Sequence, residues 1–333
     1  MIKYDNEYYK KVILNYKYDY VTSFPNISED EFKEKWLCSY NLNKFLDGVS
    51  LKEKSIIIMG IGINGIPHFG TVSQILKAIA LQKSGYFVEI ILGDLDVYGA
   101  RSKNIEDVLK LVKKYENFII NMGFDIEKGI LRNQYDYDKI LKTSFLLASV
   151  IRDKDFIDVE EEINELYKTE RVYNGMDFNV KQSISLMFAD FIHPGYFDKF
   201  KHVLIMSGID EHGYVWKANE IKNRIGINMT ISGLYSKMLR GLNNYPKMSK
   251  SLNKSTINLE CKKRDIIDII NSEKNNYDNA NNSFVFQLIS QVSLYDIDYI
   301  LKTKENCNLK NSEWEVAKQK YIDDLWKICK NWK

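Results

Sequence analysis

The most constraining feature of the sequence is the segment from residue 54 to residue 96. Residues 54–59 include an apolar run that ends at Gly60, which is typical of a buried parallel strand. A turn with three glycines follows, then apolar residues at helical spacing from Phe69 to Ala80, then a second apolar run at 87–92. Strand, glycine turn, helix and strand make a right-handed βαβ unit, the usual opening of a doubly wound sheet. The segment therefore predicts the α/β fold class, with a parallel, Rossmann-like sheet.

The rest of the chain predicts two flanking parts and one insertion. Residues 1–54 are aromatic and charged without a clear period, and we expect a helical N-terminal extension. Residues 55–258 form the Rossmann-like domain, with a late strand at 200–206 and an insertion at about 140–185. Residues 259–333 alternate apolar and charged positions at helical spacing, which predicts a small helical C-terminal module.

Composition excludes several classes of protein. The charged fraction is 28%, the formal net charge is +2, and no apolar stretch approaches the roughly 18 residues of a membrane-spanning helix. The four cysteines lie far apart without a CxxC pair, so no structural metal is expected and a reducing, cytoplasmic location is favoured. We therefore expect a globular protein with no membrane partner.

The first candidate motif begins the helix after the first strand. Pro67 suits a first helical turn, and His68, Gly70 and Thr71 follow it where helix amides favour a phosphate group. The positive end of the helix should lower the pKa of His68, which makes a neutral hydrogen-bond donor the expected form. A first-turn histidine that bonds a nearby carbonyl is an equally good interpretation of this motif alone.

The second candidate motif is a basic loop, Lys247-Met248-Ser249-Lys250-Ser251. Two lysines three residues apart can place two positive charges on a triphosphate, with hydroxyl donors between them. A third segment, Gly208-Ile-Asp210-Glu211, follows the strand at 200–206, and ligands bind at this edge of open α/β sheets.

Together these segments resemble the signatures of the class I aminoacyl-tRNA synthetases, most closely the tryptophanyl/tyrosyl subclass. His68-Phe-Gly-Thr71 is similar to the HIGH signature but departs from it at the second and fourth positions, whereas the KMSKS signature is complete. Gly208 to Glu211 resembles the Gly-x-Asp-Gln segment of the subclass, and Ala189-Asp190 resembles part of its Gln-Ala-x-Asp segment. Ser183 and Met187 stand where tyrosine enzymes carry tyrosine and glutamine, which puts a tyrosine pocket in doubt.

The resemblance implies that an amino acid is activated with ATP and Mg²⁺ to an aminoacyl-adenylate. Catalytic roles would fall to His68, Thr71, Lys247 and Lys250. ATP-binding roles would fall to Gly60, Gly62, Pro67, Gly70, Gly208, Asp210, Met248, Ser249 and Ser251. Amino-acid-binding roles would fall to Asp94, Asp96, Asp190 and Glu211, although the first two could equally cap the next segment. The resemblance also implies a homodimer that associates through the central insertion.

Three functions remain open on the sequence. The first is a synthetase that transfers the activated amino acid to tRNA. Only 82 residues follow Ser251, so any tRNA-binding domain would be shortened. The second is a synthetase-like enzyme that activates an amino acid for a biosynthetic pathway, and the third is an inactive regulatory paralogue. The intact lysines and His68 argue against the third.

Overall fold

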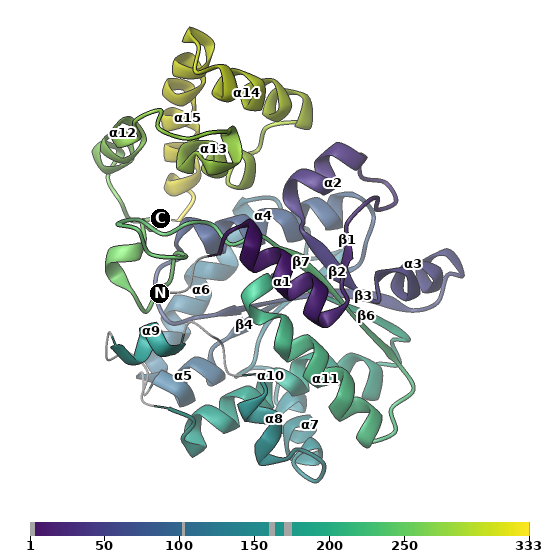
Figure 1. The fold of residues 1–333 in the computed structure, drawn as a ribbon. Helices are drawn as coiled ribbons and strands as arrows, with labels where there is room; N and C mark the ends of the chain where they lie inside the picture. Colours follow the sequence, from purple (N-terminus) through teal and green to yellow (C-terminus); the bar gives the residue numbers. More distant parts are fainter. Residues whose placement is uncertain (1–3, 102–103, 160–163, 170–174, 333) are drawn as a thin grey trace.

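The computed structural model describes residues 4–101, 104–159, 164–169 and 175–332, arranged around one mixed sheet (Figure 1). The order of its strands is β1-β2-β7-β6-β3-β4-β5, and β3 to β7 are parallel. Their bounds are β1 Asp19–Tyr20, β2 Cys38–Tyr40, β3 Ser55–Gly62, β4 Val88–Gly93, β5 Gly129–Asn133, β6 His202–Gly208 and β7 Thr230–Ser236. The predicted doubly wound α/β fold is confirmed.

Both faces of the parallel sheet are buried. Successive side chains of a strand point to opposite faces, and in β3 Ile57 and Met59 join one apolar core while Ile56 and Ile58 join the other. This explains why the strand reads as a continuous apolar run rather than an alternating one.

Helices cover both faces of the sheet (Figure 1). The first nine are α1 Asn6–Tyr16, α2 Glu29–Lys35, α3 Leu42–Ser50, α4 Phe69–Lys83, α5 Leu95–Arg101, α6 Ile105–Asn121, α7 Lys139–Leu147, α8 Asp153–Ile157 and α9 Asn164–Thr169. The others are α10 Phe178–Tyr196, α11 His212–Arg224, α12 Lys263–Ser272, α13 Phe284–Gln291, α14 Ile297–Leu309 and α15 Ser312–Lys330. Within the described ranges, none of them has the length and apolar character needed to cross a membrane.

The N-terminal region differs from the sequence prediction because it is only partly helical. Besides α1, α2 and α3 it supplies β1 and β2, and β2 pairs antiparallel with β7 through Cys38 and Tyr235. Strands of two and three residues are too short to show an apolar period, so they leave no pattern in the sequence.

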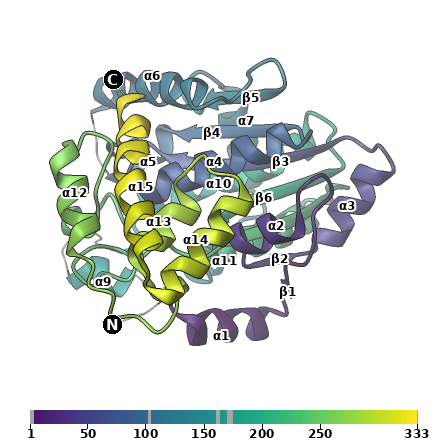
Figure 2. The same cartoon turned by 90° about the horizontal axis from the view of Figure 1, so that it is seen from above.

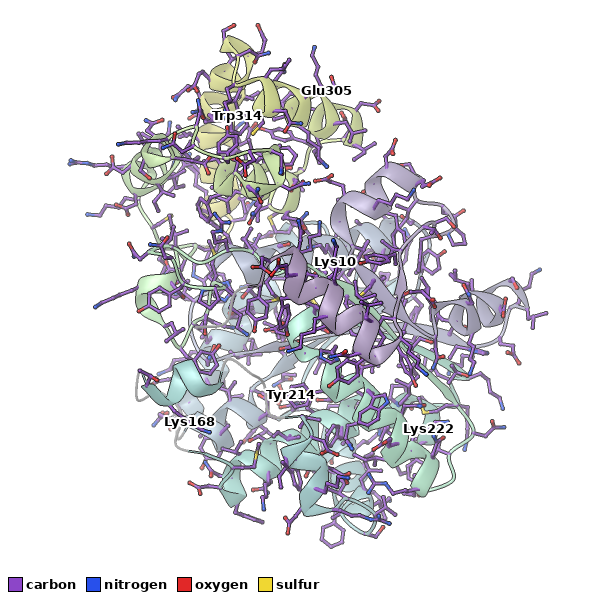
Figure 3. All side chains as sticks on the ribbon, viewed as in Figure 1. Lys10, Lys168, Tyr214, Lys222, Glu305 and Trp314 are labelled. Carbon is purple, nitrogen blue, oxygen red and sulfur yellow. The ribbon has the colours of Figure 1, made fainter. Side chains whose placement is uncertain are left out.

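The four C-terminal helices gather on one side of the sheet, as Figures 1 and 2 both show. Trp314, labelled in Figure 3, is fully buried among them. Their apolar core is continuous with the core on one sheet face, which also contains Ile57 and Phe118. The helices after residue 259 therefore pack directly on the sheet domain.

Candidate active site

The candidate site lies where the winding of the sheet reverses, between the carboxyl ends of β3 and β6. Chain order runs outward from β3 to β4 and β5 on one side, and to β6 and β7 on the other. Crevices at such switch points bind ligands in open α/β sheets. A cavity of about 1000 Å³ opens here, lined by residues of both strand ends, the start of α4 and the basic loop.

His68 is the N-cap of α4, and its imidazole faces the cavity. Its Nδ1 accepts a hydrogen bond from the backbone N–H of Thr71 at 3.2 Å, so the proton of the neutral ring belongs on Nε2. Burial, with a smaller contribution from Lys250 and Lys247, lowers the pKa of His68 to about 3. The structure therefore supports the expected neutral form of His68, which can donate a hydrogen bond. Burial lowers the pKa of this histidine more than the neighbouring charges do.

Pro67 and Gly70 help to position His68. Pro67 lies before the N-cap rather than in the first helical turn, and its carbonyl accepts a hydrogen bond from Leu259 N–H at 3.0 Å. A Cβ at Gly70 would lie 2.9 Å from Cε1 of His68 and 3.8 Å from Cβ of Met248. Gly70 is therefore needed for the histidine ring itself, and Pro67 does not line the cavity.

Lys247 is held at the end of β6. Its Nζ forms an ion pair with Asp210, and both side chains are at least nine-tenths buried. The first lysine of the basic loop thus meets the segment Gly208 to Glu211 across the cavity. A Cβ at Gly208 would come within 2.5 Å of the Asp210 carboxylate, so glycine allows this carboxylate to turn back over the strand end.

Lys250 reaches the end of β3. Its Nζ donates to the carbonyl oxygen of Gly62 and lies 3.3 Å from the hydroxyl of Tyr115, which donates to the carbonyl of Gly65 at 2.8 Å. Burial lowers the pKa of Lys250 to about 8, and Asp96 and Glu211 oppose that shift. Lys247 and Lys250 therefore place two ammonium groups against opposite strand ends of one cavity.

Ser249 ties the loop to the central insertion. Tyr167 of α9 donates its hydroxyl to Ser249 Oγ at 3.0 Å, and Ser249 N–H donates to Ser255 Oγ at 3.0 Å. Both Tyr167 and Ser249 are buried. Tyr167 could not be recognised from the sequence, because a single tyrosine in a charged segment carries no pattern.

Most of the predicted residues come together. Those that line the cavity are Gly60, Gly62, His68, Gly70, Thr71, Gly208, Asp210, Glu211, Lys247, Met248, Ser249, Lys250 and Ser251. The predicted residues that do not line it are Pro67, Asp94, Asp96 and Asp190.

Asp94 links the ends of β4 and β5 through hydrogen bonds. It is fully buried, and its carboxylate accepts hydrogen bonds from Asn133 Nδ2 at 2.8 Å and from the backbone N–H of Leu95, Gln134 and Tyr135. All its acceptor positions are used within the protein, which favours the structural alternative for this residue.

Asp96 and Asp190 belong to a buried charged network behind the cavity. Arg132 bridges Glu89 at 2.6 Å and Asp190 at 2.9 Å, and Gln134 Nε2 donates to the other oxygen of Asp190 at 2.7 Å. Asp96 Oδ1 is buried without a hydrogen-bond partner. Burial, then the nearby Asp190 and Asp94, raises the pKa of Asp96 to about 7. The network holds more carboxylates than cations.

Residues from the N-terminal region and from the C-terminal module also line the cavity, and the sequence did not predict them. Residues 4–7 and Tyr9 line it from the N-terminal side, and residues 281, 282, 286, 287, 290 and 291 line it from the C-terminal module. Tyr9 accepts a hydrogen bond from Met238 N–H at 3.1 Å, which fixes the chain where it leaves β7. Because aromatic residues are frequent along the whole chain, the aromatic residues of these walls could not be recognised from the sequence.

Comparisons with known proteins agree with this geometry. The profile of the family "tRNA synthetases class I (W and Y)" matches residues 50–330. The tryptophanyl-tRNA synthetase of the archaeon Aeropyrum pernix K1 superposes with a TM-score of 0.80 at 15% identity, covering 98% of this chain and 92% of that one. The enzyme of Encephalitozoon cuniculi, solved with tryptophan, gives 0.74 at 15%, covering 97% and 94%. That of Plasmodium falciparum gives 0.74 at 18%, covering 97% and 91%.

A search of curated protein sequences finds no match. The family profile nevertheless covers more than half of the chain, and the sheet, the helix start at His68 and the basic loop occur together as the resemblance implied. The predicted ATP-dependent ligase activity is confirmed, and the alternative of a pathway enzyme without tRNA charging is not favoured. The chain belongs to the class I tRNA synthetase family for tryptophan and tyrosine, whose members activate an amino acid with ATP and charge tRNA.

Proposed function

We propose that this chain activates tryptophan and transfers it to tRNA. The observation that carries the activation step is that His68, Lys247 and Lys250, far apart in the sequence, face one cavity at the switch point. For tryptophan, the support is that the structural relatives described above are tryptophanyl enzymes and that Ser183 and Met187 replace the residues that would bind a phenol.

In the proposed reaction the amino-acid carboxylate attacks the α-phosphorus of ATP. A new P–O bond forms, the bond to the bridging oxygen breaks, and pyrophosphate leaves with that electron pair. His68 Nε2–H and Thr71 would donate to phosphate oxygens, and the two lysines would stabilise charge on the leaving group. Positioning and charge stabilisation account for most of the catalysis in such a transfer.

Adenosine would lie along the strand ends. Gly60 and Gly62 leave the backbone of β3 open to the ligand, with nothing within 4 Å of a Cβ at Gly60. Asp210 would accept from the ribose hydroxyls once Lys247 leaves it for the phosphates. Gly70, Gly208, Met248, Ser249 and Ser251 would complete the nucleotide site, while Pro67 supports it through its carbonyl.

The amino group of the substrate would bind near Asp96 and Asp190. The unpartnered oxygen of Asp96 and the surplus of carboxylates favour a cation there, since a buried carboxylate without a partner is costly. Glu211, at the rim of the cavity, is a second candidate for this contact. Asp94 would act only by holding the loop that carries Asp96.

Magnesium would be held mainly by the phosphate oxygens of ATP. Mg²⁺ in such sites keeps several waters and few protein ligands. Across the described parts of the chain, no group of three or more His, Cys, Asp or Glu side chains could hold a metal ion. The ion would add positive charge beside the two lysines.

The proposal is tested by amino-acid-dependent ATP–pyrophosphate exchange across the standard amino acids, with and without total tRNA. We expect exchange with tryptophan at least 100-fold above exchange with tyrosine, and tryptophan attached to tRNA. Exchange that prefers tyrosine would overturn the choice of amino acid. ATP–pyrophosphate exchange without attachment of any amino acid to tRNA would overturn the choice of tRNA as the acceptor.

A cytoplasmic homodimer is part of the same proposal. The insertion exposes large apolar side chains on successive helices: Leu141 and Phe145 of α7, Ile157 of α8 and Phe178 of α10. Phe145, 83% exposed, is the most exposed of these four, and exposed apolar patches mark protein interfaces. A monomeric mass by light scattering would contradict a dimer.

Replacing Tyr167 with phenylalanine should lower kcat/KM for ATP in the exchange reaction about fivefold, the effect of one lost hydrogen bond. The change removes only the hydroxyl that donates to Ser249, so the fold and the amino-acid KM should stay unchanged. In a Ser249→Ala background the same change should have no further effect. Equal losses in both backgrounds would show that Tyr167 does not act through Ser249.

A further inference from the structure

Two cysteines that are distant in the sequence lie close together, and one of them follows the basic loop in the chain. Cys261 Sγ lies 3.9 Å from Cys329 Sγ, across 68 residues of chain. A disulfide bond is about 2.05 Å long, so the sulfurs must approach by about 2 Å. Cys38 and Cys307 are buried at other places, the first in β2 and the second beside the hydroxyl of Tyr277.

The two cysteines lie in different local settings. Cys261 is partly exposed in the loop before α12, and Cys329 is in the last turn of α15. The two segments are already held together, because Trp332 Nε1–H donates to Glu260 Oε1 at 3.2 Å. The remaining gap between the two sulfurs would be closed by rotation of the cysteine side chains together with a small shift of the loop before α12.

We propose that Cys261 and Cys329 are a redox-modification site that forms a reversible disulfide when hydrogen peroxide or another hydroperoxide is present. The Cys261 thiolate attacks one oxygen of hydrogen peroxide and the O–O bond breaks. The leaving hydroxide takes up a proton from solvent, so a sulfenic acid and one water form. Cys329 then attacks the sulfenic sulfur, the S–O bond breaks, and a second water leaves. One hydrogen peroxide thus oxidises two thiols to one disulfide and is reduced to two waters, whereas another hydroperoxide is reduced to one alcohol and one water.

The electrostatics of the pair agree with this order of events. The hydrogen bond from the Cys329 thiol lowers the pKa of Cys261, whereas the pKa of Cys329 is raised. Cys261 is also the more exposed of the two, and an exposed thiolate reacts first.

The bond would restrain the segment that leads out of the basic loop. Asn258, three residues before Cys261, pairs with His68, and Leu259 N–H donates to the Pro67 carbonyl. At the other end of the link, Trp332 packs on Tyr115, whose hydroxyl contacts Lys250. We infer that this segment moves relative to α15 when Lys247 and Lys250 leave Asp210 and Gly62. A disulfide should therefore slow turnover.

The test treats the purified full chain with hydrogen peroxide and counts thiols after denaturation. We expect four thiols to fall to two, and peptide mass spectrometry to find the peptides of Cys261 and Cys329 joined with a loss of two hydrogens. Cys329→Ser should prevent the link and leave a sulfenic acid at Cys261 that dimedone traps. Cys307→Ser should retain the link. Four remaining thiols, or Cys261 overoxidised without a link in the native chain, would overturn the proposal.

The linked protein should also melt about 5 °C higher, because the bond restricts the unfolded chain. Its rate of ATP–pyrophosphate exchange should fall at least threefold and recover with dithiothreitol. Unchanged exchange in fully linked protein would overturn the restraint on the loop. The thiol count and the melting shift do not depend on the proposed amino acid, so a wrong substrate would leave both readouts intact.

Discussion

Replacing Lys250 with alanine should lower the rate of amino-acid-dependent ATP–pyrophosphate exchange by about 10²–10³-fold. The ammonium group would face the charge that develops on the leaving pyrophosphate, and removing one such donor costs about 3–4 kcal/mol of transition-state stabilisation. We expect the loss in kcat, since the contact strengthens in the transition state.

The fold of the Lys250→Ala protein should stay intact. Burial lowers the pKa of Lys250 to about 8, so the charged form is disfavoured where it lies, and its removal should not reduce the thermal midpoint. Lys254, four residues later and exposed, is the matched control, and Lys254→Ala should leave exchange unchanged. Wild-type turnover in the Lys250→Ala protein would remove this lysine from the mechanism.

Replacing Arg132 with methionine should lower the free energy of unfolding by about 3–5 kcal/mol. The Arg132 side chain is 9% exposed and bridges Glu89 and Asp190, so its loss leaves two buried carboxylates without their cation. Urea unfolding at pH 7 measures the difference. Lys128→Met, which breaks an exposed ion pair with Asp125, should leave the free energy of unfolding nearly unchanged.

The deficit of the Arg132→Met protein should shrink as the pH falls. Burial raises the pKa of Glu89 and of Asp190 in the folded protein, and the loss of Arg132 raises both pKa values further. The folded state then binds more protons than the unfolded state, so acidification stabilises it relative to the wild type. A second change, Glu89→Gln, should recover part of the loss at pH 7. A constant deficit from pH 5 to pH 7 would show that lost packing, not unpaired charge, is responsible.

Elements with strong apolar periods could be predicted from the sequence. The runs at 54–59, 87–92 and 200–206 became β3, β4 and β6, and the segment with helical spacing from Phe69 to Ala80 became α4. The strands β1 and β2 could not be predicted, since two or three residues show no period. In addition, β1 pairs with β2, and β2 pairs with β7, about 200 residues away.

The residues of the candidate site also differ in how well the sequence predicts them. Segments where several polar residues stand at fixed spacing, such as Lys247 to Ser251, could be assigned to the cavity because their chemistry is local. Asp94 could not be separated from Asp96 by sequence, since only the tertiary structure shows that one carboxylate is fully hydrogen-bonded and the other is not. Tyr9 and Tyr167 contact partners that are distant in the sequence, and no local pattern records such contacts.

The walls contributed by the two ends of the chain have a consequence during translation. A nascent chain that has reached residue 251 already carries both signature segments, but it lacks the wall supplied by residues 281–291. A truncated product of the ribosome would therefore present its lysines on an open surface, where bulk water screens their charge. Full enclosure of the proposed nucleotide site becomes available only after α13 has emerged from the exit tunnel.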